Sequence, residues 1–338
     1  MDLKDRIKLV KRSTQEIITE EELINLLKNK KNPHAYLGTA ITGKPHIGYF
    51  VWVLKLADFL KAGFKVTLLL ADLHGALDNT PWNVLEKRYN YYSKIIPLMF
   101  ESIGANIKTL NIVKGSGFQL KKDYFLDILK MSTFISINDA KKAASEVVKF
   151  GDNPKLSGLI YPIMQSIDEV YLDADVQYGG VDQRKILVFA RENLPRLGYK
   201  PRIEVMTPLI PGLEGGKMSA SVETSKIDLL DDEKTVTSKI MGAYCKEGEV
   251  ENNGILAFLK HFVMVVKEDN KEKFIVKRDK KYGGDLKFNN YEQIENSFVR
   301  KELHPLDLKK ALASEVNIIL TPIRKKQKEL DSLAKLAY

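Results

Sequence analysis

Two short segments, far apart in the chain, contain residues suited to binding phosphate. The first is Gly43-Lys44-Pro45-His46-Ile47-Gly48-Tyr49, between a predicted strand and a predicted helix. A helix that begins at the carboxyl end of a strand offers exposed N–H groups and the positive end of its dipole, which favours anions. His46 can donate to a phosphate oxygen, and Gly48, without a side chain, lets an adenine ring lie flat on the backbone. For this segment alone, a histidine that merely begins a helix beside a packing glycine is the simpler interpretation.

The second segment, Gly215-Gly216-Lys217-Met218-Ser219-Ala220-Ser221, is a glycine-rich loop whose lysine and serines can donate to phosphate. Taken alone, it is better explained as a surface loop. The pair is more specific, because the first segment opens a helix of a predicted α/β domain and the second follows at the end of that domain. In this arrangement the chain resembles the class I aminoacyl-tRNA synthetases, whose HIGH-like helix start and KMSKS-like loop clamp ATP.

The resemblance gives roles to residues of both segments. Two positions depart from the family signatures, in ways similar to the eukaryotic tyrosyl enzymes: Tyr49 replaces the last residue of HIGH, and Ala220 replaces the second lysine of KMSKS. The implied ATP contacts are Gly43, His46, Gly48, Lys217 and Met218, and the implied catalytic residues are His46, Gly48, Lys217, Ser219 and Ser221.

A third group of polar side chains follows helical spacing within a predicted apolar helix. Between Leu159 and Val170, the residues Tyr161, Gln165 and Asp168 stand at positions i, i+4 and i+7 and share one face. A phenol, an amide and a carboxylate among apolar neighbours are costly unless they have hydrogen-bond partners. We therefore expect this face to bind a polar ligand, with a solvent-exposed stripe as the alternative.

Over nearly its whole length the sequence resembles the tyrosyl-tRNA synthetase family of the archaeal and eukaryotic cytoplasmic type. The resemblance implies that Tyr36 and Asp168 hold the substrate phenol, which agrees with the need of a phenol for both a donor and an acceptor. The segments that carry it are Tyr36-Leu37-Gly38-Thr39-Ala40, Leu70-Ala71-Asp72-Leu73-His74, Tyr161-Pro162-Ile163-Met164-Gln165, Gly180-Val181-Asp182-Gln183-Arg184-Lys185, Gly283-Gly284-Asp285-Leu286 and Leu303-His304-Pro305-Leu306-Asp307-Leu308-Lys309.

The same resemblance concerns the other end of the amino acid. It implies that Tyr161, Gln165 and Gln183 hold the ammonium group and orient the substrate. His74 follows a predicted strand at the carboxyl edge of the sheet, where open α/β sheets bind ligands, and the family places it along the tyrosine pocket. A structural histidine satisfied within the core is an equal alternative for His74.

Basic and aromatic residues adjoin in the C-terminal part. The run from Lys277 to Tyr282 combines lysines, which can follow phosphates, with a ring that can stack on an unpaired base. Asp307 could accept hydrogen bonds from a guanine edge. The resemblance implies that Tyr282 stacks on the first anticodon base and that Asp307 reads it, and we expect further tRNA contacts from Arg184 and His304. For the basic run alone, a solvated surface is the simpler interpretation.

The elements that must position these residues alternate between strands and helices. This rhythm predicts an α/β fold with a Rossmann-type, doubly wound parallel sheet. Within the first long helix, Lys55, Asp58 and Lys61 recur every three residues, which predicts one thin solvent-exposed stripe. The expected elements are a strand over 34–38, a helix over 46–62, a buried strand over 64–71, a helix over 81–103, a strand over 107–113, mostly helix over 118–172, a strand from 176, a helix to 193 and a short strand near 203.

After Ser221 the pattern changes to helices separated by basic loops, expected over 231–243, 254–267 and 305–320. We place the boundary near 222–230. Residues 1–225 are expected to form the catalytic domain, with N-terminal helices and a connecting insertion. Residues 226–338 are expected to form a mainly helical anticodon-binding domain, a role that the resemblance implies.

Composition limits the class of protein. The 338 residues are 44% hydrophobic, which suffices for a large core. A formal net charge of +9 favours polyanions such as nucleic acid, with a basic surface lacking a partner as an equal alternative. The single cysteine, Cys245, cannot form a disulfide framework or a cysteine-based zinc site, so no metal site is expected beyond a metal that a nucleotide brings. No apolar run is long enough for a membrane span, and a cytoplasmic location is expected.

The resemblance implies a tyrosine–tRNA ligase and a homodimer. L-tyrosine and Mg²⁺-bound ATP would form tyrosyl-adenylate, and the tyrosyl group would pass to the 3′ end of tRNA(Tyr). ATP with Mg²⁺ is thus a substrate, and no tightly bound cofactor is expected. Neither step needs a protein nucleophile, so catalysis would rest on positioning and on charge supplied by His46, the helix start and Lys217.

Three other functions compete with this interpretation. A tryptophanyl-tRNA synthetase shares the architecture, but Tyr36 with Asp168 favours a phenol over an indole. A non-catalytic tRNA-binding relative is disfavoured by the presence of His46, Gly48 and Lys217. A dehydrogenase is disfavoured because no Gly-x-Gly-x-x-Gly segment opens the first long helix.

Overall fold

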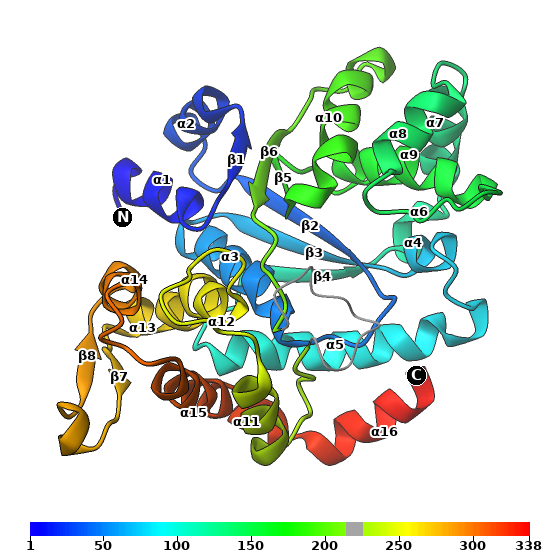
Figure 1. Ribbon diagram of the computed structural model, residues 1–338. Helices are drawn as coiled ribbons and strands as arrows, with labels where there is room; N and C mark the ends of the chain where they lie inside the picture. Colours follow the sequence, from blue (N-terminus) through cyan, green and yellow to red (C-terminus); the bar gives the residue numbers. More distant parts are fainter. Residues whose placement is uncertain (214–225) are drawn as a thin grey trace.

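A six-stranded sheet forms the centre of the molecule, in a computed structural model that describes residues 1–213 and 226–338 (Figure 1). Its strand order is β1-β6-β5-β2-β3-β4, and all neighbouring strands are parallel except β1 and β6. The predicted doubly wound α/β fold is therefore confirmed. The strands are β1 (Glu16–Ile18), β2 (His34–Ala40), β3 (Lys65–Ala71), β4 (Leu110–Lys114), β5 (Val176–Gly180) and β6 (Ile203–Thr207).

Strand β3 is buried on both faces, as its nearly continuous apolar sequence predicts. Helices α3 (Phe50–Lys61) and α5 (Leu85–Ser102) lie on one side of the sheet, and α9 (Leu156–Tyr171) and α10 (Arg184–Asn193) lie on the other (Figure 1). The strand β1, between α1 (Leu3–Lys11) and α2 (Glu20–Asn29), was not predicted. It is only three residues long and pairs at the edge of the sheet.

The predicted solvent-exposed stripe on α3 is wrong for two of its three residues. Lys55 and Asp58 are each only 2% exposed, and Lys61 alone reaches solvent. Helix α1 covers this face of α3 and supplies the partners: Lys55 Nζ donates to the carbonyl oxygen of Val10 at 2.9 Å, and Asp58 pairs with Arg12. Charges with such partners tolerate burial, which a periodicity argument does not detect.

A helical layer follows the first half of the sheet and covers the carboxyl ends of its strands. Helix α9 is its centre and packs against α7, α8, α10 and α4. This confirms the predicted helical content of residues 118–172. The other members are α4 (Asp72–Leu77), α6 (Ser116–Gln119), α7 (Lys122–Ser132) and α8 (Ile137–Ala144).

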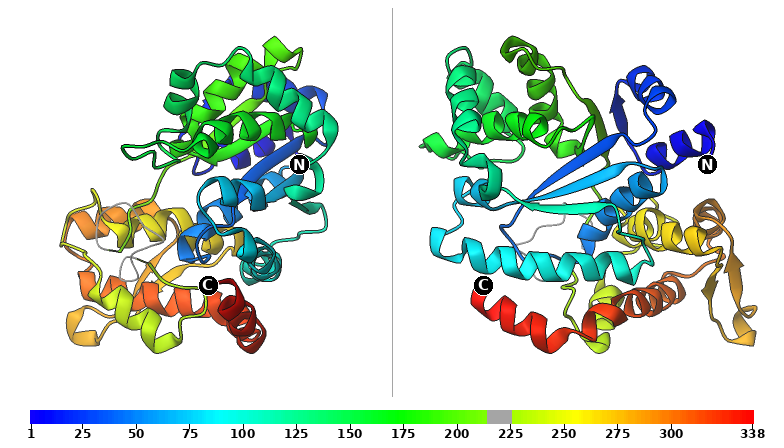
Figure 2. Two further views of the ribbon diagram at one scale, coloured as in Figure 1. Left: turned by 90° about the vertical axis from the view of Figure 1, so that its right-hand side faces the viewer. Right: turned by 180° about the vertical axis from the view of Figure 1, so that it is seen from behind.

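The residues after 226 form a second group of helices beside α3 and α5 (Figure 2). The rings of Phe50 and Phe262 stack at 4.5 Å between the two groups. An antiparallel hairpin of β7 (Phe274–Val276) and β8 (Leu286–Phe288) interrupts the helices and was not predicted. The helices are α11 (Glu233–Gly242), α12 (Gly254–Phe258), the π-turn Leu259–Val263, α13 (Met264–Asn270), α14 (Tyr291–Val299), α15 (Pro305–Arg324) and α16 (Gln327–Ala337). None of the helices within the described ranges is both long and apolar enough to cross a membrane.

Candidate active site

Two adjoining cavities open at the carboxyl ends of β2 and β5. In a doubly wound sheet this is the point where the strand order reverses, and ligands bind there. The outer cavity has a volume of about 340 Å³ and the inner one about 330 Å³. They share a wall, so a molecule in one cavity can meet a molecule in the other. The shared residues are Gly38, Thr39, Tyr49, Gln165, Asp182 and Gln183.

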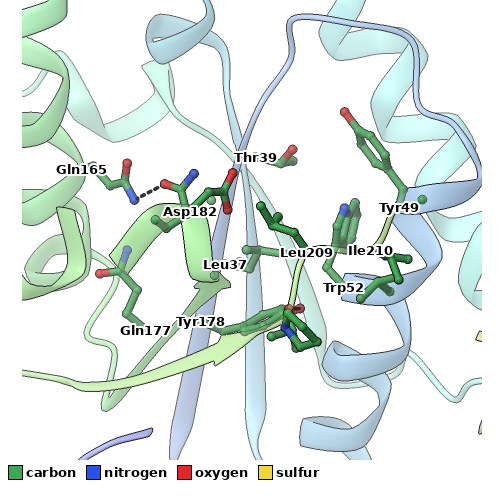
Figure 3. Close-up of a pocket in the computed structure, with 18 of the residues that line it drawn as sticks. Leu37, Thr39, Tyr49, Trp52, Gln165, Gln177, Tyr178, Asp182, Leu209 and Ile210 are labelled. Carbon is green, nitrogen blue, oxygen red and sulfur yellow. Dashed lines mark hydrogen bonds between the residues drawn. The ribbon is translucent and has the colours of Figure 1, made fainter. Parts of the chain in front are cut away.

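The outer cavity has an aromatic side and a polar side. Figure 3 shows Tyr49 and Trp52, from the start of α3, facing Gln165 and Asp182 across the space. His46 and Gly48 also line this cavity. A flat aromatic ligand with a polar edge would fit such a lining.

His46 caps a short 3₁₀ turn, Ile47–Tyr49, that precedes α3. Its Nδ1 accepts from the Gly48 N–H at 3.2 Å, which assigns the proton to Nε2. Burial, with Lys226 nearby, lowers the pKa of His46 to about 4, so the ring is neutral at pH 7. The expectation that His46 supplies positive charge is therefore corrected: it supplies an N–H dipole.

The helix start also differs from the expectation of exposed N–H groups. The Gly48 N–H is bound to His46, and the Ile47 N–H donates to the Ile227 carbonyl oxygen at 2.9 Å. His46 forms an isolated β-bridge with Asp228, whose carboxylate lies 3.4 Å from Lys44 Nζ. The chain that directly follows residues 214–225 therefore pairs with the first candidate phosphate-binding segment. The predicted Lys217, Met218, Ser219 and Ser221 lie outside the described residues.

The inner cavity holds a buried carboxylate with one free oxygen. Asp168 is fully buried on α9, and its Oδ1 accepts from Tyr124 and from Gln119 Nε2, each at 2.8 Å. Its Oδ2 has no hydrogen-bond partner among the described residues. Burial raises the pKa of Asp168 to about 7. Oδ2 is thus an acceptor available to a ligand.

Tyr36 supplies the phenol on the same cavity lining. It is 1% exposed, and burial raises its pKa well above the usual value. Its hydroxyl lies over Gly38, where an added Cβ would come within 2.7 Å of the Tyr36 oxygen. Glycine at 38 is therefore required for this position of the Tyr36 ring.

His74 also lines the inner cavity, 3.7 Å from Asp168 Oδ2. Burial lowers the pKa of His74 to about 4, so the two do not form an ion pair. Its Nε2 has no partner among the described residues, and its ring packs edge-on against Tyr161 at 4.8 Å. One ring nitrogen of His74 therefore contacts Gln119 Nε2, at 3.4 Å, and the other is available to a ligand in the cavity.

The predicted helix face on α9 points into the site. Tyr161 is 7% exposed, and Gln165 Nε2 donates to Gln183 Oε1 at 3.2 Å across the two cavities. The alternative of a solvent-exposed stripe is excluded by this burial. Sequence reasoning missed several polar residues that line or support the site, and four of them carry groups that matter most for its charge and hydrogen bonding. These four are Asp78, Gln119, Tyr124 and Asp182.

The four residues expected to contact tRNA lie away from both cavities. Arg184 begins α10 and makes a bidentate contact with Glu16, at 2.7 and 2.9 Å. Tyr282 is 64% exposed at the tip between β7 and β8. His304 caps α15 by accepting from the Leu306 N–H at 3.2 Å. Asp307 follows in the first turn of α15.

The chain matches known proteins over nearly its whole length. Residues 28–321 match the family described as class I tRNA synthetases (W and Y). The chain is 45% identical over 340 residues to the tyrosine–tRNA ligase of Haloarcula marismortui, and the match spans all of this chain and 98% of that protein. This chain belongs to the tyrosyl-tRNA synthetase family. The expected resemblance is thereby confirmed.

Other members of the tyrosyl-tRNA synthetase family are longer. The chain is 47% identical to the cytoplasmic tyrosine–tRNA ligase of Danio rerio and spans 63% of its length. Among solved structures, the synthetase of Archaeoglobus fulgidus complexed with L-tyrosine is 38% identical, with a TM-score of 0.90 over 96% of this chain and all of that one. The synthetase of Pyrococcus horikoshii, also complexed with L-tyrosine, is 27% identical, with a TM-score of 0.90 over all of this chain and 99% of that one.

Proposed function

We propose that this protein is a tyrosine–tRNA ligase, which activates L-tyrosine with ATP and transfers it to tRNA(Tyr). The observation that carries the proposal is the buried Asp168, with Oδ2 unpartnered in a cavity that Tyr36 also lines. A free phenol needs one acceptor and one donor. Asp168 Oδ2 accepts from the substrate hydroxyl, and Tyr36 donates to it.

The other end of the amino acid lies toward the shared wall of the two cavities. Tyr161, Gln165 and Gln183 present oxygens to the ammonium group. Asp182, which lines both cavities, adds a carboxylate where the amino acid meets the nucleotide. His74 lies on the phenol side and offers Nε2 to the substrate or to a bound water.

The first chemical step joins the contents of the two cavities. ATP enters with Mg²⁺ as a substrate complex, its adenosine in the outer cavity beside Gly43 and Gly48. The tyrosine carboxylate attacks the α-phosphate, the bond to the β-phosphate oxygen breaks, and pyrophosphate leaves. His46 Nε2–H donates to the phosphate oxygens, and Lys217, Met218, Ser219 and Ser221 contact them by similarity to the family. Holding both reactants in line lowers the barrier further.

The second step brings the 3′ end of tRNA to the adenylate. Its terminal ribose hydroxyl attacks the tyrosyl carbonyl and releases AMP. We assign catalysis to residues 1–225 and anticodon binding to residues 226–338. Arg278 Nη1 donates to the Glu302 carbonyl oxygen at 2.9 Å and ties the Tyr282 loop to the residues before α15. This contact supports a common anticodon surface made by Tyr282, His304 and Asp307, with Arg184 contacting tRNA nearer the site.

We also propose a homodimer that forms through α7. This helix leaves apolar side chains in solvent on one side, which a monomer rarely retains. We favour a second copy of this chain as the partner that covers these side chains, because the family resemblance implies a homodimer. The cytoplasmic relatives favour the cytoplasm as location. The exposed side chains are Phe125 at 57%, Leu126 at 43% and Leu129 at 48%, with Ile137 at 71% on the adjoining α8.

ATP–pyrophosphate exchange across the twenty amino acids tests the activity. Exchange that depends on tyrosine, followed by charging of tRNA(Tyr), is expected. Exchange that depends on tryptophan would identify the tryptophanyl alternative. Binding of tRNA without any exchange would identify a non-catalytic relative.

A further inference from the structure

Lys44 is a cation close in sequence to His46 of the candidate phosphate site. The reaction proposed above gives this lysine no role. Its Nζ lies 3.4 Å from Asp228 Oδ2, and its side chain is 33% exposed. It precedes His46 by two residues, a separation of at most about 7 Å along an extended chain. The Lys44 stem can therefore bring Nζ to a phosphate that touches His46 Nε2.

The partner of Lys44 is itself tied to His46. Asp228 forms the β-bridge with His46, and Ile227 accepts the Ile47 N–H at 2.9 Å. Asp228 Oδ1 accepts from the Leu230 N–H at 2.9 Å, which leaves Oδ2 for Lys44. Lys44 and Asp228 thus form one group with His46, which itself lines the outer cavity.

Without Lys44, this group offers no positive charge to the phosphates of the proposed reaction. His46 is neutral because burial lowers its pKa to about 4. The Ile47 and Gly48 N–H groups are already bound within the protein. Pyrophosphate leaves with several negative charges, and a cation beside His46 would help Mg²⁺ and Lys217 to neutralise them. Lys44 is the cation that the first segment supplies.

We propose that Lys44 is a pyrophosphate-binding residue, held by Asp228 in the empty enzyme and exchanged onto the departing phosphates during adenylate formation. The exchange is inexpensive, because an ion pair at 3.4 Å with a side chain one-third exposed is weak. A phosphate offers the same ammonium a stronger, charge-assisted hydrogen bond. The inference rests on the proposed ligase activity.

Lys44→Ala should lower the single-turnover rate of adenylate formation about 10- to 100-fold, the low end of what loss of one charge-stabilising donor costs. The KM for pyrophosphate in the exchange reaction should rise, while the Kd for tyrosine and the Tm stay close to wild type. Lys44→Arg should restore much of the rate. An unchanged rate and an unchanged KM for pyrophosphate in Lys44→Ala would overturn the proposal.

For Asp228→Asn we expect the opposite change in the KM for pyrophosphate. Asparagine keeps an oxygen for the Leu230 N–H but removes the charge that holds Lys44. The KM for pyrophosphate should therefore fall about two- to fivefold, the size of an exposed ion pair. A rise in that KM would contradict the exchange between Asp228 and pyrophosphate.

Lys239→Ala is the matched control. Lys239 Nζ pairs with Asp231 at 2.6 Å, and its side chain is 24% exposed, so its setting resembles that of Lys44. Lys239 lies on α11, however, and lines neither cavity. Its loss should leave the KM for pyrophosphate unchanged. If wild type shows no tyrosine-dependent exchange, the proposed function fails. If wild type is active and Lys44→Ala equals it, only the role of Lys44 fails.

Discussion

The Tyr124 hydroxyl donates to Asp168 Oδ1 at 2.8 Å, and the second oxygen of that carboxylate remains unpartnered in the inner cavity. Tyr124 comes from α7 and Asp168 from α9, so the packing of two helices sets the direction of the free oxygen. Gln119 holds the same Oδ1 at 2.8 Å. The acceptor that we propose for a substrate phenol is therefore held in place by two residues, Tyr124 and Gln119, that line neither cavity.

Asp168→Asn should weaken the selection of tyrosine over phenylalanine. An amide oxygen is a weaker acceptor for a phenol than a carboxylate, and the difference is about 1–2 kcal/mol. The ratio of kcat/KM for the two amino acids in ATP–pyrophosphate exchange should fall about 10-fold. Equal selectivity in the variant and wild type would remove Asp168 from the phenol site.

Tyr124→Phe should make tyrosine binding more dependent on pH. The Tyr124 hydrogen bond lowers the pKa of Asp168 against the larger effect of burial, so its loss raises that pKa above about 7. Less of the carboxylate is then ionised at pH 7, and the KM for tyrosine should rise there and recover near pH 9. Tyr171→Phe is the control, because Tyr171 donates to Asp127 at 3.0 Å and lines neither cavity. The same pH profile in both variants would contradict this role.

Glu204→Gln should flatten the dependence of stability on alkaline pH. Burial raises the pKa of Glu204 to about 8, and Glu169, also buried, faces it. A raised pKa means that the folded protein holds the proton more tightly than the unfolded chain. Wild-type stability should therefore fall as pH rises from about 4.5 through about 8, by about 1–3 kcal/mol for this group, and Arg191 at 3.3 Å moderates the loss.

Unfolding in urea at pH 6 and pH 9 measures this effect. The glutamine side chain cannot titrate, so the variant should lose less stability between the two values than wild type. Glu22→Gln is the control, since Glu22 pairs with Arg191 at the surface. An equal loss in all three proteins would show that Glu204 is not protonated in the folded state.

Asp307→Ala should impair charging of tRNA and spare ATP–pyrophosphate exchange. Loss of a base-edge contact is worth roughly 1–3 kcal/mol, and the defect should shrink when the first anticodon base is no longer guanine. Tyr282→Ala should weaken binding with less base dependence, because stacking tolerates any base. The alternative, that Asp307 caps α15, is less suited to the structure because His304 Nδ1 performs the capping. A loss of charging that does not depend on the anticodon base, together with a lower Tm, would instead support the capping alternative.

Phe125→Asp should convert the proposed dimer into monomers. A carboxylate at the centre of the apolar face of α7 would be desolvated in the interface without a partner, at a cost of several kcal/mol. Phe125 is 57% exposed in a single chain, so the fold itself should tolerate the change. Sedimentation or light scattering would measure the mass, and Lys122→Asp on the same helix serves as the control for added charge. A dimer that persists in Phe125→Asp would place the interface elsewhere.

The sequence predicted the sheet and the face of α9 because both follow simple periods. β3 is a run of apolar residues, and Tyr161, Gln165 and Asp168 are spaced by helical turns. The role of Tyr124 was not predicted, because it depends on how α7 packs against α9. The sequence of α7 alone does not specify that packing.

Other features arise from contacts between residues far apart in the chain. Lys55 and Asp58 have the spacing of surface residues, but the carbonyl groups at the end of α1 and Arg12 replace water as their partners. The hydrogen bond between Ile47 and Ile227, which ties the first candidate phosphate-binding segment to the chain after residue 226, joins residues 180 positions apart. No window of local sequence contains such a pairing.

The Arg12 guanidinium contacts both Asp58 of α3 and Asp269 of α13, the latter at 2.8 Å. Asp58 is almost without solvent, so removal of the residues after 226 would strip Arg12 of one partner and uncover the face of α3 on which Phe262 stacks. Melting of either part therefore withdraws support from the other, so the thermal unfolding of the two parts should be coupled. Helix α3, which follows the turn capped by His46, is in this sense held at its far end by the part of the chain to which we assign anticodon binding.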